Sequence, residues 1–124
     1  MKLDPATIQT LEAWYPAALL AEVRVVVSGP VCWFVGTVLR QGAMAFAPYV
    51  FYGRSRFDPA APALPLLAHE IKHVEQYRRH GHASFLARYF LDLARNRFRY
   101  SERLPLEAEA CAIQARVEQS LNPI

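Results

Sequence analysis

The sequence contains few cysteines and no apolar run long enough to cross a membrane. Its two cysteines, Cys32 and Cys111, lie far apart and form no C-x-x-C pair. Isolated thiols of this kind are typically buried residues rather than parts of a disulfide framework or a metal clip. The longest charge-free stretch, residues 25–39, is broken by Ser-Gly-Pro and is shorter than the roughly 20 apolar residues of a membrane-spanning helix. We therefore predict no membrane span.

Lysine is nearly absent, so the positive charge comes almost wholly from arginine. The formal charge is +3, and Lys2 and Lys72 are the only lysines. The hydrophobic fraction of 53% excludes a disordered chain, and the length accommodates one hydrophobic core. Acidic residues occupy the N-terminal segment where a signal peptide would have its apolar run. We predict a single domain over residues 1–124, located in the cytoplasm.

The hydrophobic periodicity predicts an α+β fold with a small antiparallel or mixed sheet of about three strands. A helix is expected over 5–14, with a further turn to residue 20 after the Tyr15-Pro16 break. Residues 31–39 fit a buried strand or a short helix. The remaining predicted elements are strands over 23–27, 43–46 and 49–53, and helices over 65–80, 84–96 and 105–120.

The clearest chemical signal is the stretch HEIKH at residues 69–73. Residues four apart on a helix lie about 5.4 Å apart along the axis and on one face, so His69 and His73 can converge on one metal ion. Glu70 borders that face without competing as a ligand, which suits a general base acting on water. The opposite face carries the apolar residues Leu67, Ile71 and Val74. The alternative is two ordinary surface histidines on an amphipathic helix.

A third metal ligand must come from elsewhere in the chain. The metzincin pattern requires a glycine and a third histidine where this chain has Gln76 and Arg79, so that pattern is excluded. His80 lies roughly 10 Å along the axis from His73, and we interpret it and His82 as solvated residues at a helix end.

The third metal ligand can instead be a carboxylate from a later helix. The stretch LPLEAEACA offers Glu107 and Glu109. They lie about 200° apart around a helix, so both cannot face one ion. Periodicity alone does not choose between them.

Together, LLAHEIKHVEQYRRHG and the downstream PLEAEA resemble zinc metallopeptidases of the gluzincin group. They are particularly similar to the minigluzincins and to the peptidase-like core domain of extracellular contractile injection systems. The resemblance, which covers roughly residues 23–118, implies a zincin-like fold with the sheet packed on the HExxH helix and a later glutamate-bearing helix. It implies that His69, His73 and Glu107 bind Zn²⁺ and that Glu70 is the general base. It also implies that Ala110 is the small residue that lets the two helices approach. The implied function is hydrolysis of peptide or protein substrates by a metal-activated water.

The same resemblance extends to the hairpin GAMAFAPYVFYG. In gluzincins an edge strand of this sheet binds the substrate by β-strand addition. The resemblance therefore implies a substrate-binding edge strand made of Tyr49, Val50, Phe51 and Tyr52.

The sequence departs from the gluzincin pattern beside the third ligand. Related enzymes often carry an aspartate, which supports a ligating histidine, where this chain has Cys111. Such supporting partners affect affinity or activity roughly 10- to 100-fold, so the support must come from elsewhere or be absent. Tyr100, with its neighbour Arg99, is the candidate for stabilising the transition state.

Three other hypotheses concern function and regulation. The alternative function is that of a non-catalytic, zinc-stabilised structural or interaction domain. We do not expect nucleic-acid binding, because the arginine run lacks regularly interleaved aromatic residues; the run comprises Arg78, Arg79, Arg88, Arg95, Arg97, Arg99 and Arg103. Finally, the C-terminal SLNPI is short and uncharged enough to block the site by lying along a sheet edge. The sequence does not indicate an oligomeric state.

Overall fold

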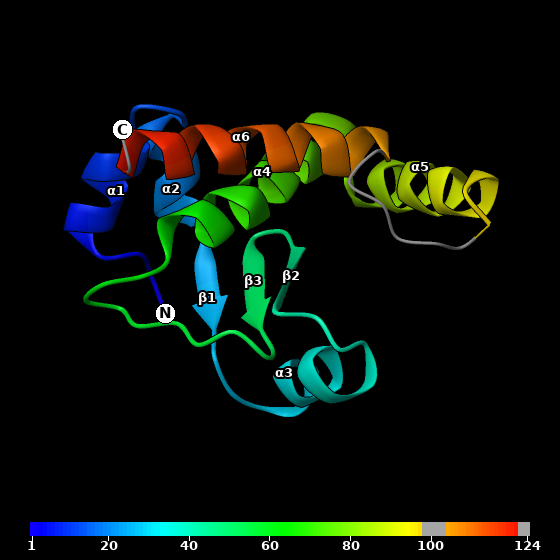
Figure 1. Ribbon diagram of the computed structural model, residues 1–124, viewed down its shortest axis with the longest axis horizontal. Helices are drawn as coiled ribbons and strands as arrows, with labels where there is room; N and C mark the ends of the chain where they lie inside the picture. Colours follow the sequence, from blue (N-terminus) through cyan, green and yellow to red (C-terminus); the bar gives the residue numbers. More distant parts are fainter. Residues whose placement is uncertain (98–103, 122–124) are drawn as a thin grey trace.

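The computed structural model describes residues 1–97 and 104–121. Helices α1 (Pro5–Leu11) and α2 (Ala17–Glu22) precede strand β1 (Arg24–Val26), and helix α3 (Pro30–Trp33) continues into the π-helical segment η1 (Phe34–Val38). Strands β2 (Ala43–Phe46) and β3 (Tyr49–Tyr52) form a hairpin, followed by helices α4 (Leu64–His80), α5 (His82–Arg95) and α6 (Pro105–Leu121). The predicted α+β class with a small mixed sheet is confirmed for this part of the chain (Figure 1).

The sheet has the strand order β1-β3-β2, so β3 is the central strand. Strand β1 pairs with β3 in parallel, placing Val25 opposite Val50, and β2 pairs with β3 in antiparallel register. The prediction that Tyr49–Tyr52 form a free edge is therefore wrong. The physical reason is that each valine of the Val25–Val50 pair is almost fully buried, and burying both favours docking β1 on the hairpin's second strand. The free edge on the hairpin side is β2.

The other edge of the sheet is partly covered by the N-terminus. The Val25 amide donates to the Met1 carbonyl (2.8 Å), and the Met1 ammonium donates to the Val25 carbonyl (2.6 Å). Lys2 and Arg24 form an isolated antiparallel bridge beside this pair. Of the two outer strands, β2 is thus the one with an edge available for a further strand.

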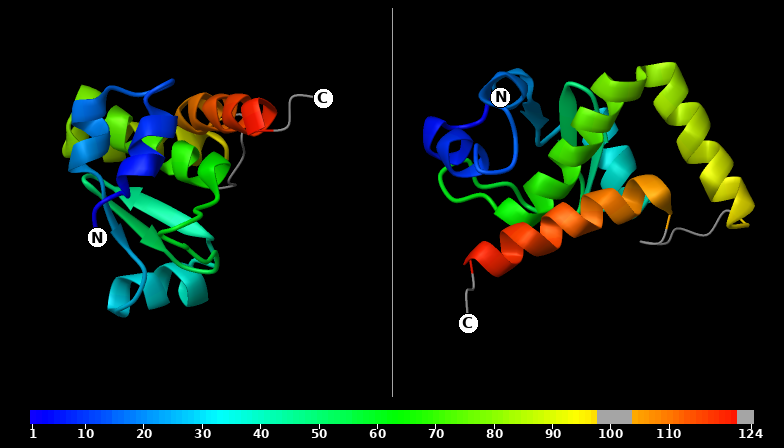
Figure 2. Two further views of the ribbon diagram at one scale, coloured as in Figure 1. Left: turned by 90° about the vertical axis from the view of Figure 1, so that its left-hand side faces the viewer. Right: turned by 90° about the horizontal axis from the view of Figure 1, so that it is seen from above.

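Helix α4 packs on the sheet, and α6 packs along α4 (Figures 1 and 2). The predicted apolar face of α4 is confirmed, since Leu67, Ile71 and Val74 are all buried. Helix α6 likewise buries an apolar stripe made of Leu106, Ala110, Ile113 and Val117. The Tyr15 hydroxyl donates to the Ala68 carbonyl (2.6 Å) and anchors the N-terminal helices on α4. Helix α1 ends at Leu11, three residues before the predicted end, where the chain turns toward this contact.

Residues 31–39 are helical rather than a buried strand. Cys32 and Val35 face inward, while most of the larger side chains of the segment are exposed. Its close approach to the end of β3 requires glycine, because a Cβ on Gly36 would lie 2.9 Å from the carbonyl carbon of Gly53. Among the described residues, no helix has both the length and the apolar character needed to cross a bilayer.

Candidate metal centre

Helices α4 and α6 bring two histidines and one glutamate to a single point. The ligand atoms of His69, His73 and Glu107 all lie within 4.8 Å of one another, and all three residues are buried. His73 Nε2 lies 2.5 Å from Glu107 Oε1, and His69 Nε2 lies 3.5 Å from Glu107 Oε2. This group can hold a metal ion, and its two imidazole nitrogens and one carboxylate form a donor set that zinc accepts.

Helix geometry explains why the three groups meet. The i, i+4 spacing places both histidines on one face of α4. Glu107 lies in the first turn of α6, and the fully buried Ala110 one turn later presents only a methyl group in the α4–α6 packing. A small side chain there allows the helix axes to approach closely.

Glu109 does not belong to the group. Its Oε1 accepts a hydrogen bond from Arg79 (2.9 Å) and lies 4.0 Å from the Lys72 ammonium. These two basic groups hold the carboxylate outside the histidine cluster. The choice between Glu107 and Glu109, which periodicity left open, is made by how α6 packs on α4.

Two glutamines hold the ligand histidines. His69 donates from Nδ1 to Gln114 Oε1 (2.8 Å), and His73 donates from Nδ1 to Gln76 Oε1 (2.8 Å). These bonds place the proton of each ring on Nδ1 and leave Nε2 to face Glu107, as metal-binding histidines require. Gln76 is fully buried and donates from Nε2 to the carbonyl of Leu106 (3.0 Å). Gln76 therefore links α4, which carries the two histidines, to the residue that precedes Glu107 on α6.

These glutamines were missed by the sequence analysis, which examined only the position of Cys111. The Cys111 sulfur lies 4.0 Å from His69 Nδ1, so the amide of Gln114, one turn further along α6, makes the closer contact. The i, i+3 relation between His73 and Gln76 was visible in the sequence. The partnership of His69 with Gln114, which are 45 positions apart, depends on tertiary packing.

Electrostatics inside the group favours a proton on the His73–Glu107 pair. Burial lowers the pKa of His73, but the hydrogen bond and the charge of Glu107 outweigh it, so the pKa lies above its usual value. Burial raises the pKa of the Glu70 carboxyl, and the two histidines only partly offset this effect. A proton thus competes with any cation for this site.

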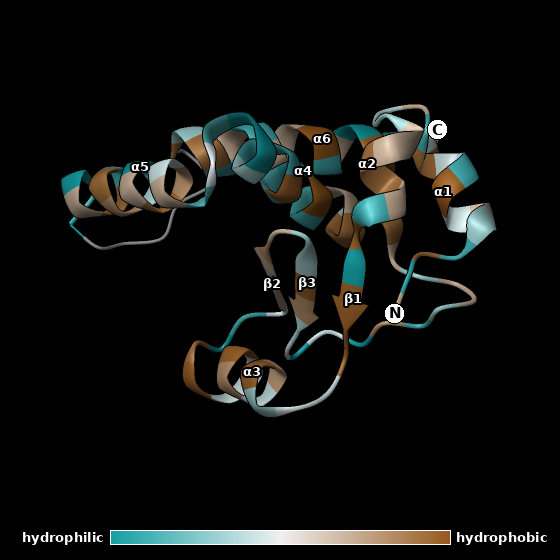
Figure 3. Ribbon diagram, turned by 180° about the vertical axis from the view of Figure 1, so that it is seen from behind, coloured by the Kyte–Doolittle hydropathy of each residue, from teal (hydrophilic) through white to brown (hydrophobic). Residues whose placement is uncertain are grey.

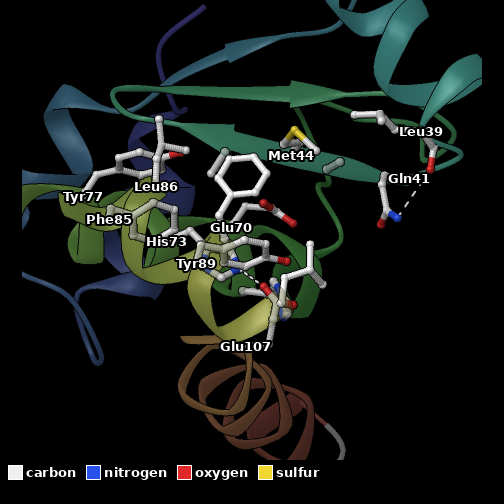
Figure 4. Close-up of a pocket in the computed structure, with 15 residues that line it drawn as sticks. Leu39, Gln41, Met44, Glu70, His73, Tyr77, Phe85, Leu86, Tyr89 and Glu107 are labelled. Carbon is white, nitrogen blue, oxygen red and sulfur yellow. Dashed lines mark hydrogen bonds and ion pairs between the residues drawn. The ribbon is translucent and has the colours of Figure 1, made fainter. Parts of the chain in front are cut away.

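A cavity of about 450 Å³ opens beside the group. His69, Glu70, His73 and Glu107 contribute its charged and titratable wall, and Figure 4 shows the Glu70 carboxylate directed into it. Most other lining side chains are apolar or aromatic: Leu39, Ala43, Met44, Ala45, Tyr77, Phe85, Leu86, Tyr89, Phe90 and Leu93. The arrangement places a carboxylate that is not part of the three-ligand group next to it, inside a largely apolar enclosure.

Tyr89 of α5 is a further polar group in this cavity. Figure 4 shows its hydroxyl directed toward the carboxylates of Glu70 and Glu107. Burial, and then the charges of these two carboxylates, raise the pKa of Tyr89 far above its usual value, so the phenol is a neutral hydrogen-bond donor. The sequence analysis did not identify Tyr89 as a candidate site residue. Tyr100, the predicted transition-state stabiliser, lies outside the described residues.

The edge strand β2 forms another part of the cavity wall. The Gly42 carbonyl accepts the Gly53 amide across the hairpin (2.8 Å). Because pairing alternates along an antiparallel ladder, Ala43 and Ala45 turn their N–H and C=O groups toward the free edge. The strand that borders the candidate site is thus β2 rather than Tyr49–Tyr52.

The remaining candidate residues that the structure describes are not members of the three-ligand group. His82 is exposed at the start of α5, as expected of a solvated residue, and its Nε2 lies 2.8 Å from the Ala47 carbonyl oxygen. The two cysteines form no disulfide with each other; Cys32 is buried as predicted, whereas Cys111 is only half-buried. Of the C-terminal SLNPI segment, the last three residues lie outside the described part of the chain.

Comparison with known proteins adds no family assignment, since no family model, no curated protein and no solved structure matches this chain significantly.

Proposed function

We propose that this protein is a zinc-dependent peptidase of the gluzincin type, with a zincin-like arrangement of sheet and helices. The observation that carries the proposal is the meeting of His69, His73 and Glu107 within 4.8 Å, in a cavity that also contains the Glu70 carboxylate. Three protein ligands with a separate neighbouring carboxylate form the arrangement used in hydrolytic zinc sites. When bound, zinc would polarise the substrate carbonyl and lower the pKa of water.

Each residue then has a distinct task. Gln114 and Gln76 orient the two histidines through Nδ1, so that both present Nε2 to the ion together with Glu107. Glu70 takes a proton from the attacking water and delivers it to the leaving amine, for which its raised pKa is suited.

Tyr89 is our candidate for stabilising the charge that develops on the substrate's carbonyl oxygen. Its phenol stays protonated because burial and the nearby carboxylates raise its pKa. A neutral hydrogen-bond donor placed beside a developing oxyanion stabilises its charge.

The substrate we infer is an extended peptide with a large apolar side chain. Ala43 and Ala45 can pair with its backbone by β-strand addition at the free edge of β2. Aromatic residues of α4 and α5 form the opposite wall; the Tyr77 and Phe85 rings are stacked with centroids 3.9 Å apart. A charged side chain would lose its hydration there without gaining a partner.

The Glu70→Gln variant tests the proposal. It should retain zinc, because Glu70 is not one of the three ligands, and it should lose roughly 10²- to 10⁴-fold in turnover of an apolar peptide library. Tyr89→Phe should lower kcat with little change in KM, which marks a contact made only in the transition state. Zinc retention with undiminished turnover in Glu70→Gln would remove Glu70 as the base. Stoichiometric zinc without turnover in the wild-type protein would instead favour a zinc-stabilised domain.

A further inference from the structure

An exposed apolar surface lies on the α3–η1 segment, apart from the candidate metal centre. Six large apolar side chains between residues 27 and 39 are more than a third exposed, and Trp33, at 63%, is the most exposed of all such side chains described. We call this set the α3/η1 surface: Val27, Val31, Trp33, Phe34, Val38 and Leu39. Single exposed apolar residues are ordinary, but six of them within one short segment indicate an interaction site.

The segment has an inner and an outer side. Cys32 and Val35 are buried, and the Cys32 thiol donates to the Val26 carbonyl (3.2 Å). Gly36 lies against the backbone at the end of β3. These contacts hold the segment in place and leave its apolar residues facing outward. Figures 1 and 3 show α3 at the opposite end of the molecule from α4 and α6.

The charged residues in the part of the chain that carries this surface have one sign. Residues 23–57 contain four arginines and no aspartate or glutamate. Arg40 follows directly after Leu39, and Arg54 is held beside η1 by a hydrogen bond from its Nε to the Gly36 carbonyl (3.1 Å). Arg56 is exposed two residues further on. The segment that carries the apolar surface therefore supplies guanidinium groups and no carboxylate, and the next acid along the chain is Asp58.

This charge pattern selects the partner. In a two-fold contact between copies of the chain, the surface would meet itself, so arginines would face arginines with no acid from residues 23–57 to pair with them. An anionic lipid surface accommodates both the apolar side chains and the arginines. Apolar and tryptophan side chains enter the interfacial region, and arginines pair with phosphate headgroups. We infer that the α3/η1 surface docks peripherally on anionic membranes.

Docking would have a consequence for the candidate site. Leu39 belongs both to the α3/η1 surface and to the lining of the cavity, and the neighbouring lining residue Met44 is also exposed. The cavity wall formed by Leu39 and β2 would therefore lie close to the lipid headgroups. The inference itself does not depend on the proposed peptidase activity, because none of the metal-site residues takes part in it.

Vesicle binding by the full chain tests the inference. The Trp14→Phe variant leaves Trp33 as the only tryptophan. In this background we expect binding to vesicles of equal parts phosphatidylcholine and phosphatidylglycerol, with a blue shift of Trp33 fluorescence and quenching by brominated lipid. Much weaker binding is expected to phosphatidylcholine alone and at raised salt. Arg40→Gln with Arg56→Gln should weaken binding to the anionic vesicles roughly 25-fold, at about fivefold for each arginine near the surface.

The apolar contribution needs a matched pair of variants. Trp33→Ser with Phe34→Ser should reduce binding by at least about tenfold. Leu91→Ser with Leu121→Ser replaces side chains of similar exposure, 51% and 48%, outside this surface and should bind like the wild type. Circular dichroism checks that each variant is folded. The absence of vesicle binding, equal binding to neutral vesicles, or equal loss in both double variants would overturn the inference. If the protein did not bind vesicles but formed a dimer that required Trp33, the surface would be assigned to a second copy of the chain. That result would also overturn the inference.

Discussion

Replacing Gln114 with leucine isolates the contribution of the histidine-orienting amides. The substitution removes the acceptor for His69 Nδ1 (2.8 Å) and keeps a side chain of similar size. His69 then loses the bond that fixes its ring, and zinc affinity should fall roughly 10- to 100-fold, or about 1.4 to 2.8 kcal/mol. Gln114 is only half-buried, so water can replace the lost bond and the metal-free protein should lose about 1 kcal/mol.

The equivalent change at Gln76 should behave differently. Gln76 is fully buried, and its amide accepts from His73 Nδ1 and donates to the Leu106 carbonyl. Leucine there leaves both partners buried and unpaired, at about 1–3 kcal/mol each, which totals roughly 2–6 kcal/mol. Against a typical stability of about 5–15 kcal/mol, Gln76→Leu should destabilise the fold itself as well as weaken zinc binding.

Two measurements distinguish these effects. Competition with a chromophoric chelator gives the zinc affinity, and urea denaturation of the metal-free protein gives the free energy of unfolding. Gln114→Glu keeps an acceptor for His69 and should retain affinity, and Gln119→Leu, at an exposed position of the same helix, is the control. A folded Gln114→Leu protein that binds zinc as tightly as wild type would refute the assigned role of Gln114.

Three further predictions concern the ligands, pH and the edge strand. Glu107→Gln should lose zinc, whereas Glu109→Gln should retain it by metal analysis; the reverse result would exchange their roles. The pKa of His73 is raised above its ordinary value of 6.5, so protonated His73 stabilises the metal-free protein. This stabilisation is fully present below pH 6.5 and is lost as the pH rises through the raised pKa. Zinc needs this imidazole neutral, so the increase in Tm on adding zinc should be larger near pH 8 than near pH 6, and a pH-independent increase would contradict the coupling. Ala45→Pro removes one outward N–H from β2, at an edge position where proline is tolerated, and should raise KM for peptides without lowering Tm; an unchanged KM would exclude strand addition at this residue.

Local patterns determined a large part of this structure. The helices α4 and α6 were predictable because the spacing of Leu67, Ile71 and Val74, and of the α6 stripe, is a property of each helix alone. The pairing of His69 with His73 was predictable for the same reason, since the i, i+4 spacing brings them together in any helix. The hairpin strands were bounded by the turn at Ala47-Pro48.

Only the tertiary structure decided which partners from distant parts of the chain meet. Both hairpin strands alternate in the same way, so the sequence could not show that β1 pairs with β3 and leaves β2 as the edge. The support of His69 by Gln114, the presence of Tyr89 in the cavity, and the selection of Glu107 over Glu109 each depend on how two helices are rotated against one another. Periodicity defines the apolar side of a helix, whereas the polar residues at its borders acquire their roles from whichever element packs beside them.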